Sequence, residues 1–226
     1  MISVVIPTLN AAPYLAKALL PLVTGATEGL IKQVVVADGG SEDATCAIAE
    51  GAGCDVVACS PGRAGQLIAG AGAARGTWLL FLHADTVLGP GWMEAVERFM
   101  ARRDSLERAA AFRFAFDDDS AGARSVQFWT RLRGSVLKLP YGDQGLLISR
   151  AFYDALGGYR PLGLMEDVDL VRRIGGKRLT LLDAEAVTSA DKYRRDGFQR
   201  RAWGNLLLTA RYLMGADPAK LAKDYA

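Results

Sequence analysis

Four short apolar runs, separated by stretches with helical spacing, constrain the fold of this chain more than any other feature. The runs are rich in β-branched and aromatic residues and occupy residues 2–7, 31–37, 54–58 and 77–82. The helical stretches occupy residues 14–23, 42–51 and 64–75, with Ser41 as the expected N-cap of the second and Gly76 after the third. Strands that alternate with helices in this way predict βαβ units, in which the strands are buried and parallel.

The second half of the chain is less regular. We expect strands at 109–116, 145–149 and 178–183, helices at 123–137, 150–156 and 198–214, and a further helix starting at Asp217-Pro218. No repeat or low-complexity linker divides the 226 residues. The sequence therefore predicts one α/β domain, with a mixed sheet flanked by helices and a C-terminal helical segment.

Charge and cysteine content exclude several classes of protein. Lys and Arg number 27 against 25 Asp and Glu, a balance that gives no reason to expect a nucleic-acid partner. Cys46, Cys54 and Cys59 form no CxxC pair, so we expect neither a disulfide framework nor a zinc site, and a reducing cytoplasm fits best. The segment MISVVIPTLN has no basic region and only a short apolar run, so we expect no signal peptide, and no apolar run is long enough to span a bilayer. We expect a cytoplasmic protein that is soluble or peripheral at the inner face of the membrane.

The loops after the predicted strands carry the functional argument, because the carboxyl ends of parallel strands meet at one edge of a sheet. The first loop, Pro7-Thr8-Leu9-Asn10, lacks the glycines of a dinucleotide-binding loop. The second, Asp38-Gly39-Gly40-Ser41, puts a carboxylate on a tight turn, where it suits either a base and ribose or the cap of the next helix.

The third and fourth loops add an arginine and an acid. Arg63 begins a Gly-rich helix start, which suits a diphosphate, although an arginine there is also often solvated or salt-bridged. His83 and Asp85 are two residues apart in an extended segment, so both side chains can face one ligand. The alternative for His83 is a strand-end histidine bonded to a backbone carbonyl.

These loops resemble the nucleotide-sugar half of the family 2 glycosyltransferases, which have the GT-A fold. The resemblance rests on PTLN, ADGGSED, SPGRAGQ and LLFLHADT, in that order over residues 1–90. GRAGQ together with FLHADT is similar to the small radical-SAM/selenodomain-associated transferase subgroup, as are Tyr141–Gly145 and Leu164–Leu170. The resemblance implies a Rossmann-like GT-A domain with a nucleotide-sugar half (1–90), an acceptor and catalytic half (91–190) and basic amphipathic helices (191–226).

The resemblance also implies roles for individual residues. The donor nucleotide is expected to contact Pro7, Thr8, Asn10, Asp38, Gly39, Arg63, His83 and Ala84. Asp85 corresponds to the direct ligand of Mg²⁺ or Mn²⁺, a hard ion that prefers carboxylate and phosphate oxygens. His83 need not bind the metal. Asp143 and Gln144 are expected near the sugar or acceptor.

Sugar transfer requires a base that takes the proton of the acceptor hydroxyl, usually a carboxylate. Glu166, Asp167 and Asp169 are expected just before the helix-like run of Leu170, Val171 and Ile174. Acids at that place can simply complement the positive end of a helix. The match to the family's Glu-Asp motif favours Asp167 as general base, with Glu166 as its rival. Direct attack by the acceptor inverts the anomeric centre, so an α-linked donor gives a β-linked product.

The C-terminal region combines arginines with aromatic residues over 192–203, followed by the apolar stretch Leu206–Met214. It suits an interfacial helix beside anionic lipid, a lid over a diphosphate, or a helix that packs its leucines on the sheet. Phe128 and Trp129 are expected in the core or an acceptor-site wall, and 117–119 in a solvated acidic turn.

The leading hypothesis is therefore a metal-dependent, inverting glycosyltransferase that uses a nucleoside-diphosphate sugar, with UDP as the expected nucleotide. Its acceptor is unknown, and lipid-linked acceptors are among the candidates. A sugar-phosphate nucleotidylyltransferase is one alternative, although it should carry a Gly-rich basic loop where this chain has PTLN. A non-catalytic nucleotide-sugar-binding protein is another. It is suggested by Ile68, where related sequences carry asparagine, and by Ser189-Ala190-Asp191-Lys192, which lacks the paired arginines expected after Ser-Ala.

Overall fold

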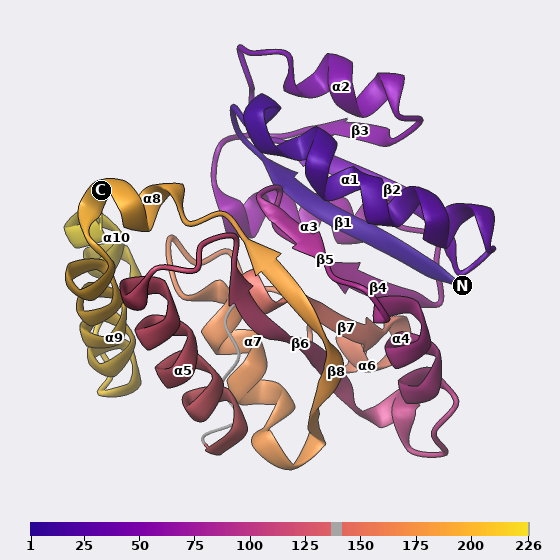
Figure 1. Ribbon diagram of the computed structural model, residues 1–226. Helices are drawn as coiled ribbons and strands as arrows, with labels where there is room; N and C mark the ends of the chain where they lie inside the picture. Colours follow the sequence, from indigo (N-terminus) through magenta and orange to yellow (C-terminus); the bar gives the residue numbers. More distant parts are fainter. Residues whose placement is uncertain (137–141, 226) are drawn as a thin grey trace.

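In a computed structural model, which describes residues 1–136 and 142–225, eight strands form one mixed sheet in the order β3-β2-β1-β4-β7-β6-β8-β5. The strands β1, β2, β3, β4, β6 and β8 run parallel, while β7 and β5 are antiparallel to their neighbours. Helices cover both faces (Figure 1). The predicted mixed α/β architecture is confirmed. Tyr141 and the last expected residue of the 123–137 helix lie outside the described residues.

The first half follows the predicted alternation closely. Its elements are β1 (Ile2–Thr8), α1 (Ala12–Thr27), β2 (Ile31–Asp38), α2 (Thr45–Gly51), β3 (Asp55–Ala58), α3 (Arg63–Ala73) and β4 (Trp78–Phe81). Two details differ. Ser41 does not cap α2, which begins at Thr45 with Ala44 at its N-cap. The strand β3 lies at the edge of the sheet and is half-buried rather than buried.

The second half contains more structure than the sequence indicated. Its elements are β5 (Thr86–Leu88), α4 (Trp92–Met100), η1 (Ser105–Glu107), β6 (Ala109–Phe116), α5 (Ala121–Val136), η2 (Gly142–Gln144), β7 (Leu146–Ser149), α6 (Arg150–Ala155), α7 (Glu166–Ile174), η3 (Gly176–Arg178), β8 (Leu179–Thr188), α8 (Asp191–Asp196), α9 (Phe198–Leu213) and α10 (Pro218–Tyr225). The strand β5 and the helix α4 were not predicted. The strand β8 continues five residues beyond its expected end at Asp183.

Apolar side chains on the two faces of the sheet form two core clusters. Ile2, Val4 and Ile6 of β1 point to the face covered by α1 and α4, where Trp92 and Phe99 also pack. Val5 points to the other face, with side chains of α3, α6 and α7. This alternation is the period of a strand buried on both sides. It fixes the register of β1 and, with it, the place where each neighbouring strand ends.

One expectation for the second half was wrong. Phe128 and Trp129 do not lie in the core, because more than half of each side chain is exposed. The acidic segment 117–119 lies between β6 and α5 with Asp117 and Asp119 exposed, as expected. Two of its acids also make contacts: Asp117 Oδ1 accepts a hydrogen bond from the backbone of Ala190 at 2.7 Å, and Asp118 pairs with Arg194 at 2.8 Å. These contacts attach α8 to the end of β6. Among the described residues, no helix has the length and apolar character needed to cross a membrane.

Candidate active site

The carboxyl ends of the six parallel strands meet at one edge of the sheet, and a cleft opens beside the ends of β4 and β8. Of the predicted site residues, this cleft is lined by Arg63, His83, Asp85, Asp143 and Asp167. The others do not line it: Pro7, Thr8, Asn10, Asp38, Gly39, Ala84, Gln144 and Glu166. Of the residues outside the cleft, Pro7, Thr8, Asn10, Asp38 and Gly39 lie at the ends of β1 and β2 or in the loops that follow, whereas Ala84, Gln144 and Glu166 lie beside cleft residues in the sequence.

Asp38 is the centre of the loops after β1 and β2. Its buried carboxylate accepts hydrogen bonds from Thr8 Oγ1 at 2.9 Å, from the backbone of Gly40 at 2.9 Å, and from both the backbone and the hydroxyl of Ser41. Burial alone would raise the pKa of Asp38, but these hydrogen bonds outweigh it and hold the pKa below its usual value. The carboxylate is therefore ionised and firmly fixed.

Side chains of the loop after β2 and of the first residue of α2 accept hydrogen bonds from backbone N–H groups just before and at the start of α1. The N–H groups of Asn10 and Ala11 donate to the hydroxyls of Ser41 and Thr45, each at 2.8 Å, and Ala12 donates to Asp43. Helix starts leave such groups without partners inside the helix, so side chains from the next loop supply them. Asn10 also has a positive φ of 50°. The loops after β1 and β2 therefore form one rigid unit.

Gln66 of α3 locks this unit to the sheet. Its buried amide donates to the carbonyls of Thr8 and Ala37, at 2.5 and 3.1 Å. Gly39 lies directly against it, since a Cβ on Gly39 would stand 3.0 Å from the Gln66 amide nitrogen. A glycine is therefore needed here for close approach rather than for turning.

In the cleft, the contacts of Arg63 give the two candidate bases, Glu166 and Asp167, different environments. Its Nε donates to Glu166 Oε1 in a close ion pair, and its Nη2 lies 3.7 Å from Asp167 Oδ2. The Glu166 side chain is only 2% exposed, whereas 13% of Asp167 and 40% of Arg63 are exposed. Burial raises the pKa of Glu166, and the Arg63 charge opposes this. Glu166 thus anchors Arg63, while Asp167 faces the cleft.

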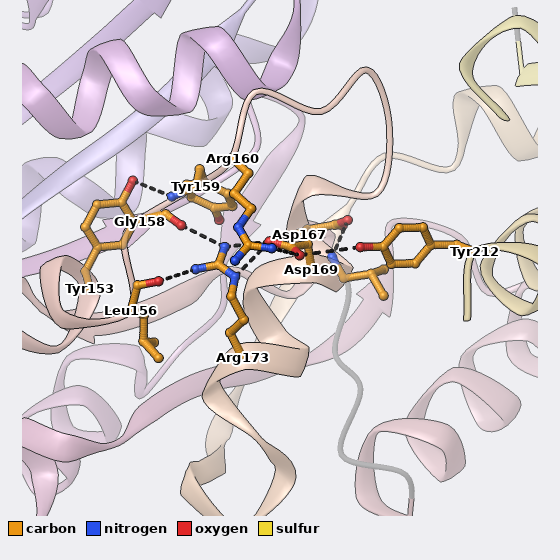
Figure 2. A network of polar contacts seen from close by, with 10 residues as sticks. Tyr153, Leu156, Gly158, Tyr159, Arg160, Asp167, Asp169, Arg173 and Tyr212 are labelled. Atoms are coloured by element: carbon orange, nitrogen blue, oxygen red, sulfur yellow. Dashed lines mark hydrogen bonds and ion pairs between the residues drawn. The ribbon is translucent and has the colours of Figure 1, made fainter. Parts of the chain in front are cut away.

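The third acid of this segment, Asp169, has a structural role. Arg173 approaches its carboxylate at 2.6 Å, Arg160 at 3.4 Å and the Tyr212 hydroxyl at 3.5 Å, and Figure 2 shows the three groups converging on it. Arg173 also donates to the carbonyls of Leu156 and Gly158. The network ties the 156–165 loop to α7. Contrary to the expectation of acids mostly ahead of the helix, all three acids lie in its first turn.

His83 and Asp85 follow β4 and face the cleft with Lys192 of α8. Burial, reinforced by Arg63, lowers the pKa of His83 to about 4, so its imidazole is neutral at physiological pH. Lys192 Nζ lies 3.7 Å from Asp85 Oδ2, and the lysine side chain is 60% exposed. The backbone N–H of Ser189 donates to the Asp85 carbonyl at 3.0 Å. The loop that carries both side chains is therefore attached to the end of β8.

The two residues expected near the sugar are separated by the fold. Asp143 lines the cleft, and its carbonyl accepts a hydrogen bond from Thr188 at 3.3 Å. Gln144 is buried and donates to the carbonyl of Phe112 at 2.9 Å. Gln144 thus attaches η2 to β6 through Phe112, whereas Asp143 lines the cleft.

Residues of α8 and α9 complete the cleft, and their individual roles were not predicted. They are Lys192, Tyr193, Arg201, Asn205, Leu208 and Thr209. Arg201 pairs with Asp196 at 2.6 Å and lies over the ring of Tyr193. The interpretation that α9 packs its leucines on the sheet was wrong: Leu208 packs with Met165, Val168 and Leu221, while Leu206, Leu207 and Leu213 are exposed. The lid over a diphosphate and the interfacial helix stay predictions. Ser189 and Lys192 could have been predicted as cleft residues because they follow a strand closely. That prediction needed β8 to end at Thr188 rather than at the expected Asp183.

The cleft fits a divalent cation only if a bound substrate supplies further oxygen ligands, such as phosphates. Among the described residues, no group of three or more His, Cys, Asp or Glu side chains could hold a metal ion. Mg²⁺ and Mn²⁺, however, are commonly bound by one or two carboxylates together with substrate phosphates. Asp85, with its carboxylate 19% exposed in the cleft, can supply such a carboxylate.

Solved structures are similar to this chain in fold. Glucosyl-3-phosphoglycerate synthase from Mycobacterium tuberculosis, in complex with Mn²⁺, UDP and glucosyl-3-phosphoglycerate, has a TM-score of 0.60 at 20% identity, covering 92% of this chain and 78% of that one. The same enzyme with Mn²⁺, UDP-glucose and phosphoglyceric acid gives 0.59 at 19%, covering 92% and 78%. TarS from S. aureus in complex with UDP gives 0.60 at 18%, covering 85% and 62%. The predicted GT-A fold is confirmed.

Sequence comparison gives a more specific result. Residues 3–146 match the model of Glycosyl transferase family 2, which covers more than half of the chain. No curated protein matches the sequence. The matched segment contains the loops after β1 and β2, the start of α3 with Arg63, and the His83 and Asp85 loop.

Proposed function

Because the chain belongs to glycosyl transferase family 2 and is a glycosyltransferase, we propose that it transfers a sugar from a UDP-sugar to an acceptor hydroxyl, in a metal-dependent and inverting reaction. The observation that carries the proposal is the convergence of Asp85, Asp167 and Arg63 on one cleft beside the ends of parallel strands. We also propose that the chain belongs to the radical-SAM/selenodomain-associated subgroup, on the motifs given above.

In the proposed donor site, the rigid loops after β1 and β2 hold the base and ribose, and the cleft holds the diphosphate and sugar. Arg63 and Lys192 are cations on either side of His83 and Asp85, which suits a diphosphate. Neutral His83 can donate to, or accept from, a ribose hydroxyl. Asp85 would hold Mg²⁺ or Mn²⁺, which when bound neutralises charge on the departing diphosphate.

Asp167 is the proposed general base. The acceptor oxygen attacks the anomeric carbon, the bond from that carbon to the diphosphate oxygen breaks, and the hydroxyl proton passes to Asp167. Attack from the side opposite the leaving group inverts the anomeric centre. Glu166 is disfavoured as the base because it is buried and paired with Arg63. Asp143 is proposed near the sugar or acceptor, while Gln144, Ala84 and Gly39 contribute through the backbone they shape.

We further propose that residues 1–90 bind the nucleotide sugar, that 91–190 bind the acceptor and carry the base, and that 191–226 close the cleft. Asp143, Asp167 and Ser189 belong to the second segment, and Lys192 to the third. The proposed location is the cytoplasm, with contact at the inner face of the membrane. Lipid-linked hydroxyls are one proposed class of acceptor, because α9 lines the cleft on one face and exposes apolar residues on the other.

The test is a thermal-shift screen of nucleotide sugars with and without Mn²⁺, since a bound ligand raises stability by mass action. UDP-sugars with Mn²⁺ are expected to raise the melting temperature, and Mn²⁺ alone to have little effect. Asp85→Ala should remove the Mn²⁺-dependent part of the shift. An Asp85→Ala variant that binds UDP and Mn²⁺ as tightly as the parent would overturn the metal assignment.

Turnover is tested separately from binding. Slow hydrolysis of the donor, or transfer to an acceptor, should disappear in Asp167→Asn while the thermal shift with donor remains. No shift with any nucleotide sugar would contradict the proposed function. A shift without turnover in the parent, over a broad range of acceptors, would favour the non-catalytic alternative.

A further inference from the structure

Three aromatic side chains on α5 and α9 are more than half exposed. Phe128 is 61% exposed, Trp129 64% and Trp203 67%. More than half of the large exposed apolar side chains that the structure describes lie on these two helices or directly after α9, namely Phe128, Trp129, Trp203, Leu206, Leu207, Leu213 and Met214. Such gatherings mark sites of interaction.

The exposed aromatic residues form one surface, because α5 and α9 lie side by side and run in the same direction (Figure 1). At their starts, a Cβ on Gly122 would stand 3.1 Å from Phe198, and Gln199 donates to Ser125 at 3.4 Å. One helical turn beyond Ser125 and Gln199 lie Trp129 and Trp203. The two tryptophans therefore each lie one turn beyond the contact between the helices.

The inner faces of the same helices are already occupied. Ala123 and Val126 of α5 belong to a core cluster with Phe114 and Phe116, and Phe198 and Ala202 of α9 pack against that cluster. On α9, Leu208 and Thr209 turn toward the cleft. The apolar side chains on the outer face, including Trp129 and Trp203, thus take no part in the core of the described structure.

The charge of the two helices is one-sided. The sequences of α5 and α9 contain six arginines and neither aspartate nor glutamate. Arg131 is paired with Glu185, and Arg201 with Asp196. The Arg200 side chain, in contrast, is exposed and makes no hydrogen bond or ion pair with the described part of the chain. An aromatic surface with basic residues and no acids complements an anionic layer.

We propose that the α5–α9 surface, consisting of Phe128, Trp129, Arg200, Trp203, Leu206 and Leu207, docks on a bilayer that contains anionic phospholipid. Tryptophan rings favour the headgroup region, where an apolar body and a polar edge are both satisfied. A helix with an apolar face and arginines lies in the plane of that interface. Arg200 faces the lipid phosphates. Docking does not depend on sugar transfer, although it would bring the α9 wall of the cleft to the membrane.

The first test is flotation with vesicles of phosphatidylcholine alone and of phosphatidylcholine with about one third phosphatidylglycerol. The protein is expected to float with the anionic vesicles and not with the neutral ones, and added salt should weaken the binding. Trp129→Ser with Trp203→Ser should lower the partition coefficient by about tenfold or more. Arg200→Gln should lower it about fivefold.

Matched controls separate docking from general stickiness and from catalysis. Leu20→Ser with Leu106→Ser removes two apolar side chains that are 67% and 60% exposed elsewhere, and vesicle binding should stay unchanged. Asp167→Asn should also bind vesicles like the parent, so failure of the proposed transfer does not affect this test. All variants should keep the melting temperature of the parent, because the altered side chains are exposed or, for Asp167, at the cleft.

Intrinsic fluorescence locates the contact. The chain has four tryptophans, of which Trp78 and Trp92 are buried, so changes on vesicle addition report Trp129 and Trp203. We expect a blue shift and protection from acrylamide with anionic vesicles. The proposal is overturned by equal binding to neutral vesicles or by no binding to anionic ones. It is also overturned if sedimentation shows a dimer in which these tryptophans are already protected, since a second copy then covers the surface.

Discussion

The fold holds its carboxylates in two different ways on the two sides of the proposed donor site. In the loops after β1 and β2, Asp38 is fixed by neutral donors, the hydroxyls and backbone N–H groups of Thr8, Gly40 and Ser41. At the start of α7, the carboxylates are held by arginines, with Arg63 on Glu166. Neutral donors therefore hold the Asp38 carboxylate in place without a positively charged partner. A half-exposed arginine, in contrast, can exchange one anion for another.

This difference indicates a division of work. The loops after β1 and β2 are a fixed frame, in which the acceptor positions of Asp38 are all in use. The start of α7 is a charge cluster in which Glu166 anchors Arg63, and we propose that Arg63 Nη2, 3.7 Å from Asp167, binds the diphosphate while Asp167 remains in the cleft. Substitutions on the two sides should therefore separate into effects on stability and effects on turnover.

The largest expected effect is on turnover, from Asp167→Asn. Loss of a general base typically lowers the rate by about 10²- to 10⁴-fold. We expect kcat to fall in that range while the affinity for the nucleotide changes by less than about twofold. Steady-state kinetics and calorimetric titration with UDP measure the two quantities. Asp183→Asn, at a carboxylate 69% exposed on β8, is the control and should be silent. A variant that retains about a tenth of the parent activity would remove Asp167 from the mechanism.

The next effect is on stability, from Asp169→Ala. The substitution leaves the mostly buried Arg173 guanidinium without its carboxylate, and breaking such a pair typically costs about 3–5 kcal/mol of unfolding free energy. Urea denaturation measures the loss. Arg160→Gln removes a partner that is 58% exposed and should cost less than about 0.5 kcal/mol. Equal losses in both variants would mean that the network does not depend on the buried pair.

On the frame side, Asp38→Asn should cost about 1–3 kcal/mol, because an amide cannot accept all the hydrogen bonds that the carboxylate accepts. The pKa of Asp38 is lowered in the folded state, so its contribution is present above the unfolded pKa of about 3.9 and is lost as the pH falls through the folded value. Urea denaturation at neutral and acidic pH should therefore show a gap between parent and variant that closes in acid. A gap that stays constant would show that ionisation of Asp38 is irrelevant to stability.

The smallest expected effect comes from Lys192→Met. Because the lysine is 60% exposed, its attraction to a diphosphate is partly screened, and we expect about fivefold weaker binding of UDP with an unchanged melting temperature. Titration with UDP at low salt measures it. Lys177→Met, at an exposed lysine of η3 outside the cleft, is the matched control. An unchanged affinity in Lys192→Met would place the diphosphate away from α8.

The sequence predicted the fold best where each apolar run is continuous and ends in turn-forming residues, as in β1, β2 and β4. It failed at β5, whose three residues are too few to show a period. It also failed at α4, although Trp92, Ala95, Val96 and Phe99 have helical spacing. The second part of β8 begins with Asp183, Ala184, Glu185 and Ala186, residue types of low strand propensity, so the strand was expected to end before Val187 and Thr188.

The candidate site was predictable to the extent that its residues follow strands. Arg63, His83 and Asp85 were brought together as expected because the ends of β3 and β4 meet at one edge of the sheet. The roles within the α7 segment were not predictable, since spacing alone cannot tell which acid an arginine buries. The position of Lys192 beside Asp85 was not predicted, because it depends on the five residues by which β8 extends beyond its expected end.

The hydrogen bond from the Ser189 backbone N–H to the Asp85 carbonyl has a consequence for how this protein can vary. The contact that orients the proposed metal-binding loop uses no side-chain atom of either residue. Mutational drift at position 189 is therefore tolerated as long as an N–H remains, and of the twenty amino acids only proline lacks it. Sequences that differ freely there can keep the same geometry at Asp85, which an alignment of side chains would not reveal.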